Sequence, residues 1–161
     1  MKLLMMSAAL ATIAIAAPAA AQVMTPAEYV MAAGAGDLYE ITSSQVLLET
    51  TQDPKLRSFA QMMITDHTKS TADVKAAAAR SRVKAMPPKL NPLQQELITE
   101  LRAEQGPARD AAYVAQQKAS HGQALNVQKA YAMEGTAPAL RAVAVTIVPV
   151  VEHHIMELGS M

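Results

Sequence analysis

The sequence predicts an all-α protein: four long helices in two antiparallel hairpins, joined by a connector that contains a short helix of its own. Aromatic residues make up 3% of the 161 residues and alanine is abundant, a balance that favours helices over sheets. Cap-plus-proline and glycine signals divide the chain into helix-length pieces. Within those pieces apolar residues recur three and four positions apart, the period of a packed helix.

The N-terminus predicts an export signal over residues 1–21. Lys2 supplies a positive start, Leu3–Ala16 are almost wholly apolar, and small residues at Ala19–Ala21 form a cleavage pattern. The apolar run of about 14 residues is shorter than the ~20 needed to cross a bilayer. We expect cleavage near Ala21, a single mature domain over residues 22–161, a periplasmic or secreted location, and no membrane span later in the chain.

Composition excludes several classes of function. The chain has no cysteine, which rules out disulfides, thiol catalysis and cysteine-ligated metals. Its 14 basic residues are matched by 14 acidic ones, so no basic field is available for nucleic acid.

A capping residue followed by a proline predicts the start of each of the first two helices. Thr25–Glu28 reads as a capping box with proline at the first helical position, and this helix is expected to run to about Thr51. Asp53-Pro54 begins the second, which can continue through the alanine run 76–79 and must end before Pro87-Pro88. The short loop between them makes the two helices antiparallel neighbours.

The second half of the chain has the same kinds of helix start and stop signals and follows a connector of roughly 22 residues. Asn91-Pro92 opens a short helix to about Gln105, and a long helix runs from Pro107 to Glu134, where Gly135 supplies a cap. The last helix begins at Thr136 or Pro138 and should kink at Pro149. A connector of this length can travel the length of the bundle, which is the crossover topology of ferritin-like bundles.

Histidines lie on the apolar seams of three helices. The last helix has a seam with spacings of four and three, and the second and third long helices follow the same rule. The first helix is less clear, because Ile41 and Leu48 define a competing seam. The four seams are Val30, Ala33, Asp37, Glu40, Ser44 and Leu47; Leu56, Ala60, Met63, His67, Ser70, Val74 and Ala77; Val114, Gln117, His121, Leu125, Gln128 and Ala132; and Leu140, Ala144, Ile147, Val151, His154 and Leu158.

The inward polar groups also fall near one height. Glu40 lies 13 residues before Asp53 and His67 lies 14 after it, so both sit ~20 Å from the turn. His121 lies 14 residues before Gly135 and His154 lies 19 after it, a mismatch of about one turn. One inward polar group from each helix is what a metal site in a bundle core requires.

These residue types suit a transition metal. Three imidazoles and one carboxylate would hold zinc, copper or iron and leave positions open for water. We therefore predict Glu40, His67, His121 and His154 as ligands, with Asp66 and Tyr113 beside them as hydrogen-bonding partners. Asp66 is expected to orient His67 or to pair with Lys69.

The alternative is a structural or stress-associated bundle without metal, in which each histidine is a hydrogen-bonded core residue. An ordinary di-iron site is disfavoured because the chain contains no Glu-x-x-His motif. The methionines are scattered and read as core fillers rather than copper ligands. The sequence does not decide whether the protein is an enzyme.

Several segments resemble the domain-of-unknown-function family 4142. The similarity lies in Glu28–Glu40, in Phe59–Lys69 with its Asp-His-Thr-Lys element, in Asp110-x-x-Tyr113 followed by His121, and in Val148–Ile155. It covers about residues 26–158. The resemblance implies an exported bacterial protein of the ferritin-like superfamily, with His67, His121 and His154 at the family's histidine positions and Glu40 as the matching acid. It implies no activity.

Overall fold

The computed structural model describes residues 24–161, and the predicted export signal lies outside them. These residues form five helices and no strand, which confirms the predicted all-α class; the ferritin-like description stays a prediction. The helices are α1 (Pro26–Leu48), α2 (Pro54–Arg80), α3 (Pro92–Ala103), α4 (Gly106–Glu134) and α5 (Pro138–Gly159).

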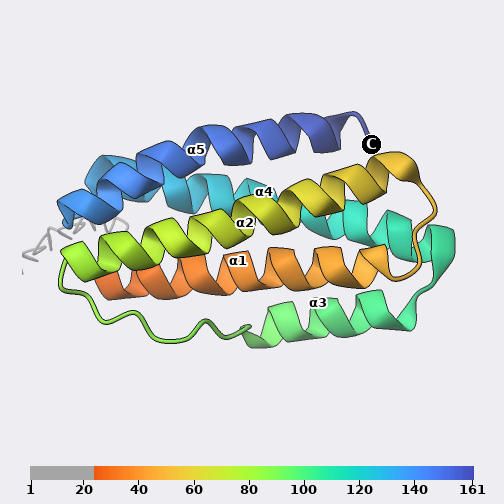
Figure 1. The fold of residues 1–161 in the computed structure, drawn as a ribbon, viewed down its shortest axis with the longest axis horizontal. Helices are drawn as coiled ribbons and strands as arrows, with labels where there is room; N and C mark the ends of the chain where they lie inside the picture. The colour runs from red at the N-terminus through yellow and green to blue at the C-terminus, as the bar shows by residue number, and fades with distance from the viewer. Residues whose placement is uncertain (1–23) are drawn as a thin grey trace, which may run out of the picture.

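The four longer helices lie lengthwise beside one another, and α3 packs along the outside against α1 and α4 (Figure 1). α1 and α2 are antiparallel, as are α4 and α5. The connector and α3 return along the whole length of the molecule, so α2 and α4 point the same way (Figure 1). The predicted hairpins and the connector with its short helix are therefore present.

The starts of α1, α2 and α3 follow from local capping by side chains. At Thr25 the side chain accepts from the backbone of Glu28, whose own side chain accepts from the backbone of Thr25. Asp53 caps α2 through the backbone N–H groups of Lys55 and Leu56, and Asn91 forms a capping box at α3. Each cap satisfies N–H groups that the first helical turn cannot.

Two helix ends differ from expectation. α1 stops at Leu48 rather than near Thr51, and α3 stops at Ala103. α2 ends at Arg80 because Arg82 adopts a positive φ of 56° and the Val83 N–H reaches back 2.9 Å to the carbonyl of Ala78. This is a Schellman ending with arginine where glycine is usual.

Gly135 caps the C-terminus of α4 as predicted, but without the positive φ that is usual for a glycine cap. Its φ of −56° is one that any residue adopts. A side chain there would instead place its Cβ 2.6 Å from the ring of Tyr131, so the close approach of that ring requires glycine.

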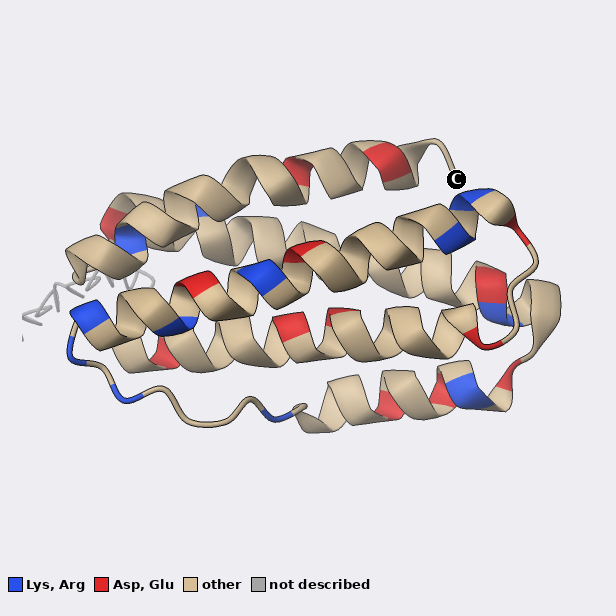
Figure 2. Cartoon of the chain, in the orientation of Figure 1, with Lys and Arg blue, Asp and Glu red and all other residues tan. Residues whose placement is uncertain are grey.

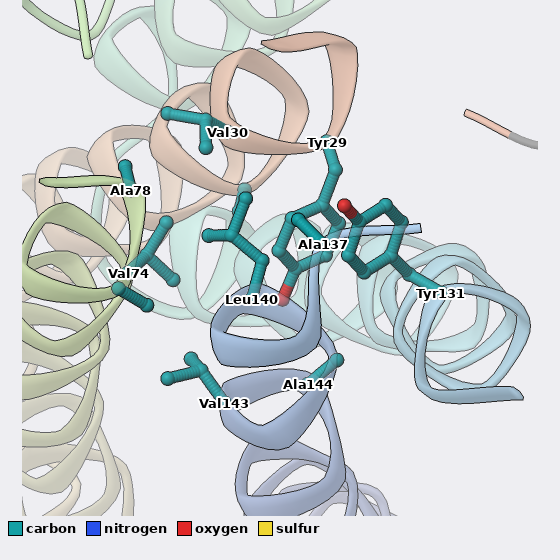
Figure 3. Close-up of a cluster of buried hydrophobic side chains, with 11 residues drawn as sticks. Tyr29, Val30, Val74, Ala78, Tyr131, Ala137, Leu140, Val143 and Ala144 are labelled. Atoms are coloured by element: carbon teal, nitrogen blue, oxygen red, sulfur yellow. The ribbon is translucent and has the colours of Figure 1, made fainter. Parts of the chain in front are cut away.

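Two hydrophobic clusters fill the interior, one toward each end. The Tyr29 cluster is centred on the stacked rings of Tyr29 and Tyr131, whose centroids are 3.8 Å apart (Figure 3). Its members are Tyr29, Val30, Ala33, Val74, Ala77, Ala78, Tyr131, Ala137, Leu140, Val143 and Ala144. The Tyr39 cluster comprises Tyr39, Val46, Leu47, Leu56, Phe59, Ala60, Met63, Ile98, Leu101, Tyr113 and Leu158. The buried residues between the two clusters are mainly polar, so a polar layer separates them; it includes Asp37, Glu40, Gln117, His121 and His154.

α5 is the one helix among residues 24–161 that is long and apolar enough to cross a bilayer, with a mean hydropathy of 1.4 over its most apolar window. The sequence led us to expect that no segment after the export signal is long and apolar enough to cross a bilayer, and by this measure of length and composition that expectation was wrong. Core helices that line a protein interior pass it too. Here one side of α5, including Leu140, Ala144 and Leu158, is buried against the other helices.

Candidate metal centre

The polar layer brings three histidines together from three helices. His67 comes from α2, His121 from α4 and His154 from α5, and one ring nitrogen of each lies within 4.8 Å of the others. His121 and His154 are 1% and 0% exposed, and the His67 side chain is 11% exposed. The one-turn mismatch expected between His121 and His154 does not separate them, because His121 Nε2 lies 3.3 Å from His154 Nδ1.

One nitrogen of each ring, called the outer nitrogen below, is hydrogen-bonded to an acceptor that is not one of the three histidines. His67 Nδ1 donates to Asp37 Oδ1 at 2.8 Å, His121 Nδ1 donates to the Gln117 carbonyl at 3.0 Å, and His154 Nε2 donates to Asp66 Oδ2 at 3.0 Å. Carbonyls and carboxylates only accept, so these contacts place a proton on the outer nitrogen of each ring. The inner nitrogen of a neutral ring then carries a lone pair.

Those inner nitrogens have no donor to satisfy them. His67 Nε2 is buried without a hydrogen-bond partner. His121 Nε2 and His154 Nδ1 face each other as two lone pairs when both rings are neutral. Two nitrogens bound to one tetrahedral zinc ion at 2.0–2.1 Å are about 3.3 Å apart, which is the spacing seen here.

Burial sets the charge of two of the rings. It lowers the pKa of His121 to about 3, with further lowering from His67 and His154. It also lowers the pKa of His154, against the raising effect of the hydrogen bond that this ring donates to Asp66. Both rings are therefore neutral at pH 7, the form that binds metals.

His67 behaves in the opposite way. Burial alone would lower its pKa, but the hydrogen bond to Asp37 and the nearby carboxylates together outweigh burial and raise the pKa. In the metal-free protein the His67 ring is therefore more readily protonated than a free imidazole, and a metal ion bound at Nε2 would displace that proton.

Glu40 lies beside the cluster rather than inside it. Its Oε1 is 3.8 Å from His121 Nδ1, the nitrogen on the far side of the ring from His154, and its Oε2 has no partner. The side chain is buried, and burial raises its pKa despite the charge of His67. The three-histidine group that can share an ion does not include this carboxylate.

The expected hydrogen-bonding residues lie elsewhere or contact other partners. Asp66 holds His154, not His67, and Lys69 pairs with Asp73 instead. The Tyr113 hydroxyl is 2.8 Å from the Ser44 hydroxyl, and its ring belongs to the Tyr39 cluster.

Sequence reasoning missed the role of Asp37. This side chain is 6% exposed and accepts both from His67 and from the Thr71 hydroxyl, the latter at 3.0 Å. The available signal was its place on the first-helix seam, one turn before Glu40.

Comparison with known proteins supports the family and the fold. The family model described as Domain of unknown function (DUF4142) matches residues 11–161. The crystal structure of the DUF305 protein from Streptomyces coelicolor, which is described as secreted, superposes with a TM-score of 0.70 at 12% identity. The match covers 82% of this chain and 86% of that one, and shows a shared fold. None of the curated proteins matches this chain.

Proposed function

Because this chain belongs to the DUF4142 family and carries three converging histidines, we propose that it is an exported protein that binds one divalent transition metal ion. The ligands are His67 Nε2, His121 Nε2 and His154 Nδ1. The observation that carries the proposal is that all three outer nitrogens are held by acceptors while the inner nitrogens face one another. Export follows from the N-terminal signal pattern, with cleavage near Ala21 and a periplasmic or secreted destination.

Charge balance favours a divalent ion. Three neutral imidazoles bring no charge, whereas Asp37 and Asp66 each place a carboxylate on the outer nitrogen of a ligand ring. Two negative charges next to the ligands match an ion of charge +2. Glu40 is held toward its protonated form by burial and is not needed for this balance.

Imidazole ligands suit zinc, copper or iron, and three protein ligands leave a fourth position for water or another molecule. Asp66 is the more exposed of the two carboxylates that accept from the ligand rings, with a side chain 33% exposed against 7% for Asp37. We propose that ions enter past Asp66 and the His67 edge. The role that fits these features is metal binding or handling.

The test is a zinc titration of the metal-stripped protein by calorimetry, with metal content measured after dialysis. We expect one zinc ion per chain. His67→Ala and His154→Gln should each abolish stoichiometric binding while the far-ultraviolet circular dichroism stays helical. His153→Ala is the matched control, because His153 is exposed and lies outside the cluster.

Two results would defeat the proposal: no uptake of zinc, copper or iron by the wild-type protein, or equal loss of binding in His153→Ala. Either would leave the alternative function, a structural helical protein whose core histidines are only hydrogen-bonded.

A further inference from the structure

A cavity that none of the histidines lines lies between the start of α1, the later part of α2 and the connector at residues 81–91. Its volume is about 610 Å³, within the range of small-molecule sites. Buried Val30 and Val74 contribute to its lining, together with exposed Met31 and Met86.

The connector forms one wall of this cavity. Pro87 and Pro88 line it, and the Pro88 ring lies next to Gly34 of α1, where an added Cβ would be in ordinary van der Waals contact with it at 3.4 Å. Met31 and Met86 are 58% and 59% exposed, so flexible apolar side chains from two different segments lie where the cavity meets solvent.

The charged residues of this cavity are all basic. Lys75 and Lys89 line it, and no carboxylate does. Within residues 24–161 neither lysine forms an ion pair with any acid. Residues 74–95 contain five basic residues and no acidic one, and Figure 2 shows the basic residues along the connector.

We infer that this cavity binds a free single-chain anionic amphiphile, an acyl carboxylate. The acyl chain would lie against Val30, Val74 and the two methionines, and the carboxylate would be paired by Lys75 and Lys89. An apolar ligand without charge would leave the two lysines unused, and a small hydrophilic anion would leave the apolar walls unused. Only a ligand with both parts matches both features.

Thr71 connects this cavity to the polar layer. It lines the cavity, and its hydroxyl donates to Asp37, which in turn accepts from His67. The binding inferred here needs no metal ion, so it can be measured on the metal-free protein and stands or falls independently of the proposed metal centre.

The experiment is calorimetric titration of the metal-free protein with dodecanoate below its micelle concentration. We expect saturable binding of one molecule per chain. Dodecyltrimethylammonium, which has the same chain length and a positive head group, should bind at least ~10-fold more weakly.

Variants then locate the site. Lys75→Gln with Lys89→Gln should weaken dodecanoate binding by ~10-fold or more, and Met86→Glu should do the same by placing a negative charge at an exposed position. Lys84→Gln with Lys118→Gln is the matched control, because neither residue lines the cavity.

Three outcomes would overturn the inference. They are equal binding of the anionic and cationic amphiphiles, unchanged binding in the Lys75/Lys89 double variant, or binding to phosphatidylglycerol vesicles with none to free dodecanoate. The last outcome would point to an anionic bilayer surface as the partner.

Discussion

Replacing His121 by glutamine should remove a large part of the acid sensitivity of the folded protein. In the fold, burial and the charges of His67 and His154 lower the pKa of His121 to about 3. In the unfolded chain the same ring titrates near its ordinary value of about 6.5. Between these values the unfolded chain binds a proton that the folded protein does not, so stability is present above pH 6.5 and falls as the pH drops.

The size of the effect follows from linkage. Each pH unit inside this window costs about 1.4 kcal/mol for one such group, so His121 alone lowers the free energy of unfolding by about 2 kcal/mol between pH 7 and pH 5. The lowered pKa of His154 acts in the same direction. The raised pKa of His67 has the opposite sign: its contribution is present below about pH 6.5 and is lost as the pH rises through the folded value.

The assay is urea denaturation of the metal-free protein at pH 7, 6 and 5. Between the two extremes, the wild-type protein should lose about 2 kcal/mol more of its free energy of unfolding than His121→Gln does. His153→Gln, at an exposed position, should lose as much as the wild type. Equal losses in the wild type and His121→Gln would refute the reasoning.

Three further predictions concern other contacts. Asp37→Asn should weaken zinc binding by about 10- to 100-fold in a competition assay, because it removes the charge behind His67; Asp73→Asn, whose partner is exposed Lys69, should leave it unchanged. Arg109→Met should lower the free energy of unfolding by about 2 kcal/mol or more, because the buried guanidinium donates at 2.8 Å to the carbonyls of Val46 and Glu104. A free energy of unfolding within about 0.5 kcal/mol of wild type, a difference typical of surface substitutions, would contradict this. Thr25→Ala should cost about 1 kcal/mol by chemical denaturation through loss of the α1 cap, and no cost at all would mean that the capping box does not form in solution.

The starts of α1, α2 and α3 could be predicted from the sequence because their signals are local. Thr25, Asp53 and Asn91 each cap within three residues of themselves, so side chain and backbone partner are read from one short segment. The end of α2 could not be predicted in the same way. Its stop depends on Arg82 in a left-handed conformation, for which glycine is the usual signal.

In the candidate site, too, the features set by local sequence could be predicted and those set by helix packing could not. Helical periodicity placed His67, His121 and His154 inward, because the seam depends only on spacing within each helix. Periodicity could not predict the hydrogen-bond partners of the rings. Asp66 and His154 are 88 positions apart, and their contact depends on how α2 and α5 pack. Asp37 and Glu40 share one helical face, so spacing alone could not tell which carboxylate meets an imidazole.

The most direct measurement of the metal centre is long-range ¹H–¹⁵N nuclear magnetic resonance of the histidine rings, recorded with one equivalent of zinc. The account predicts that the metal-linked shifts fall on Nε2 of His67 and His121 and on Nδ1 of His154, with protons retained on the three opposite nitrogens. Ring nitrogens unchanged by zinc, or three rings all bound through the same nitrogen type, would contradict it.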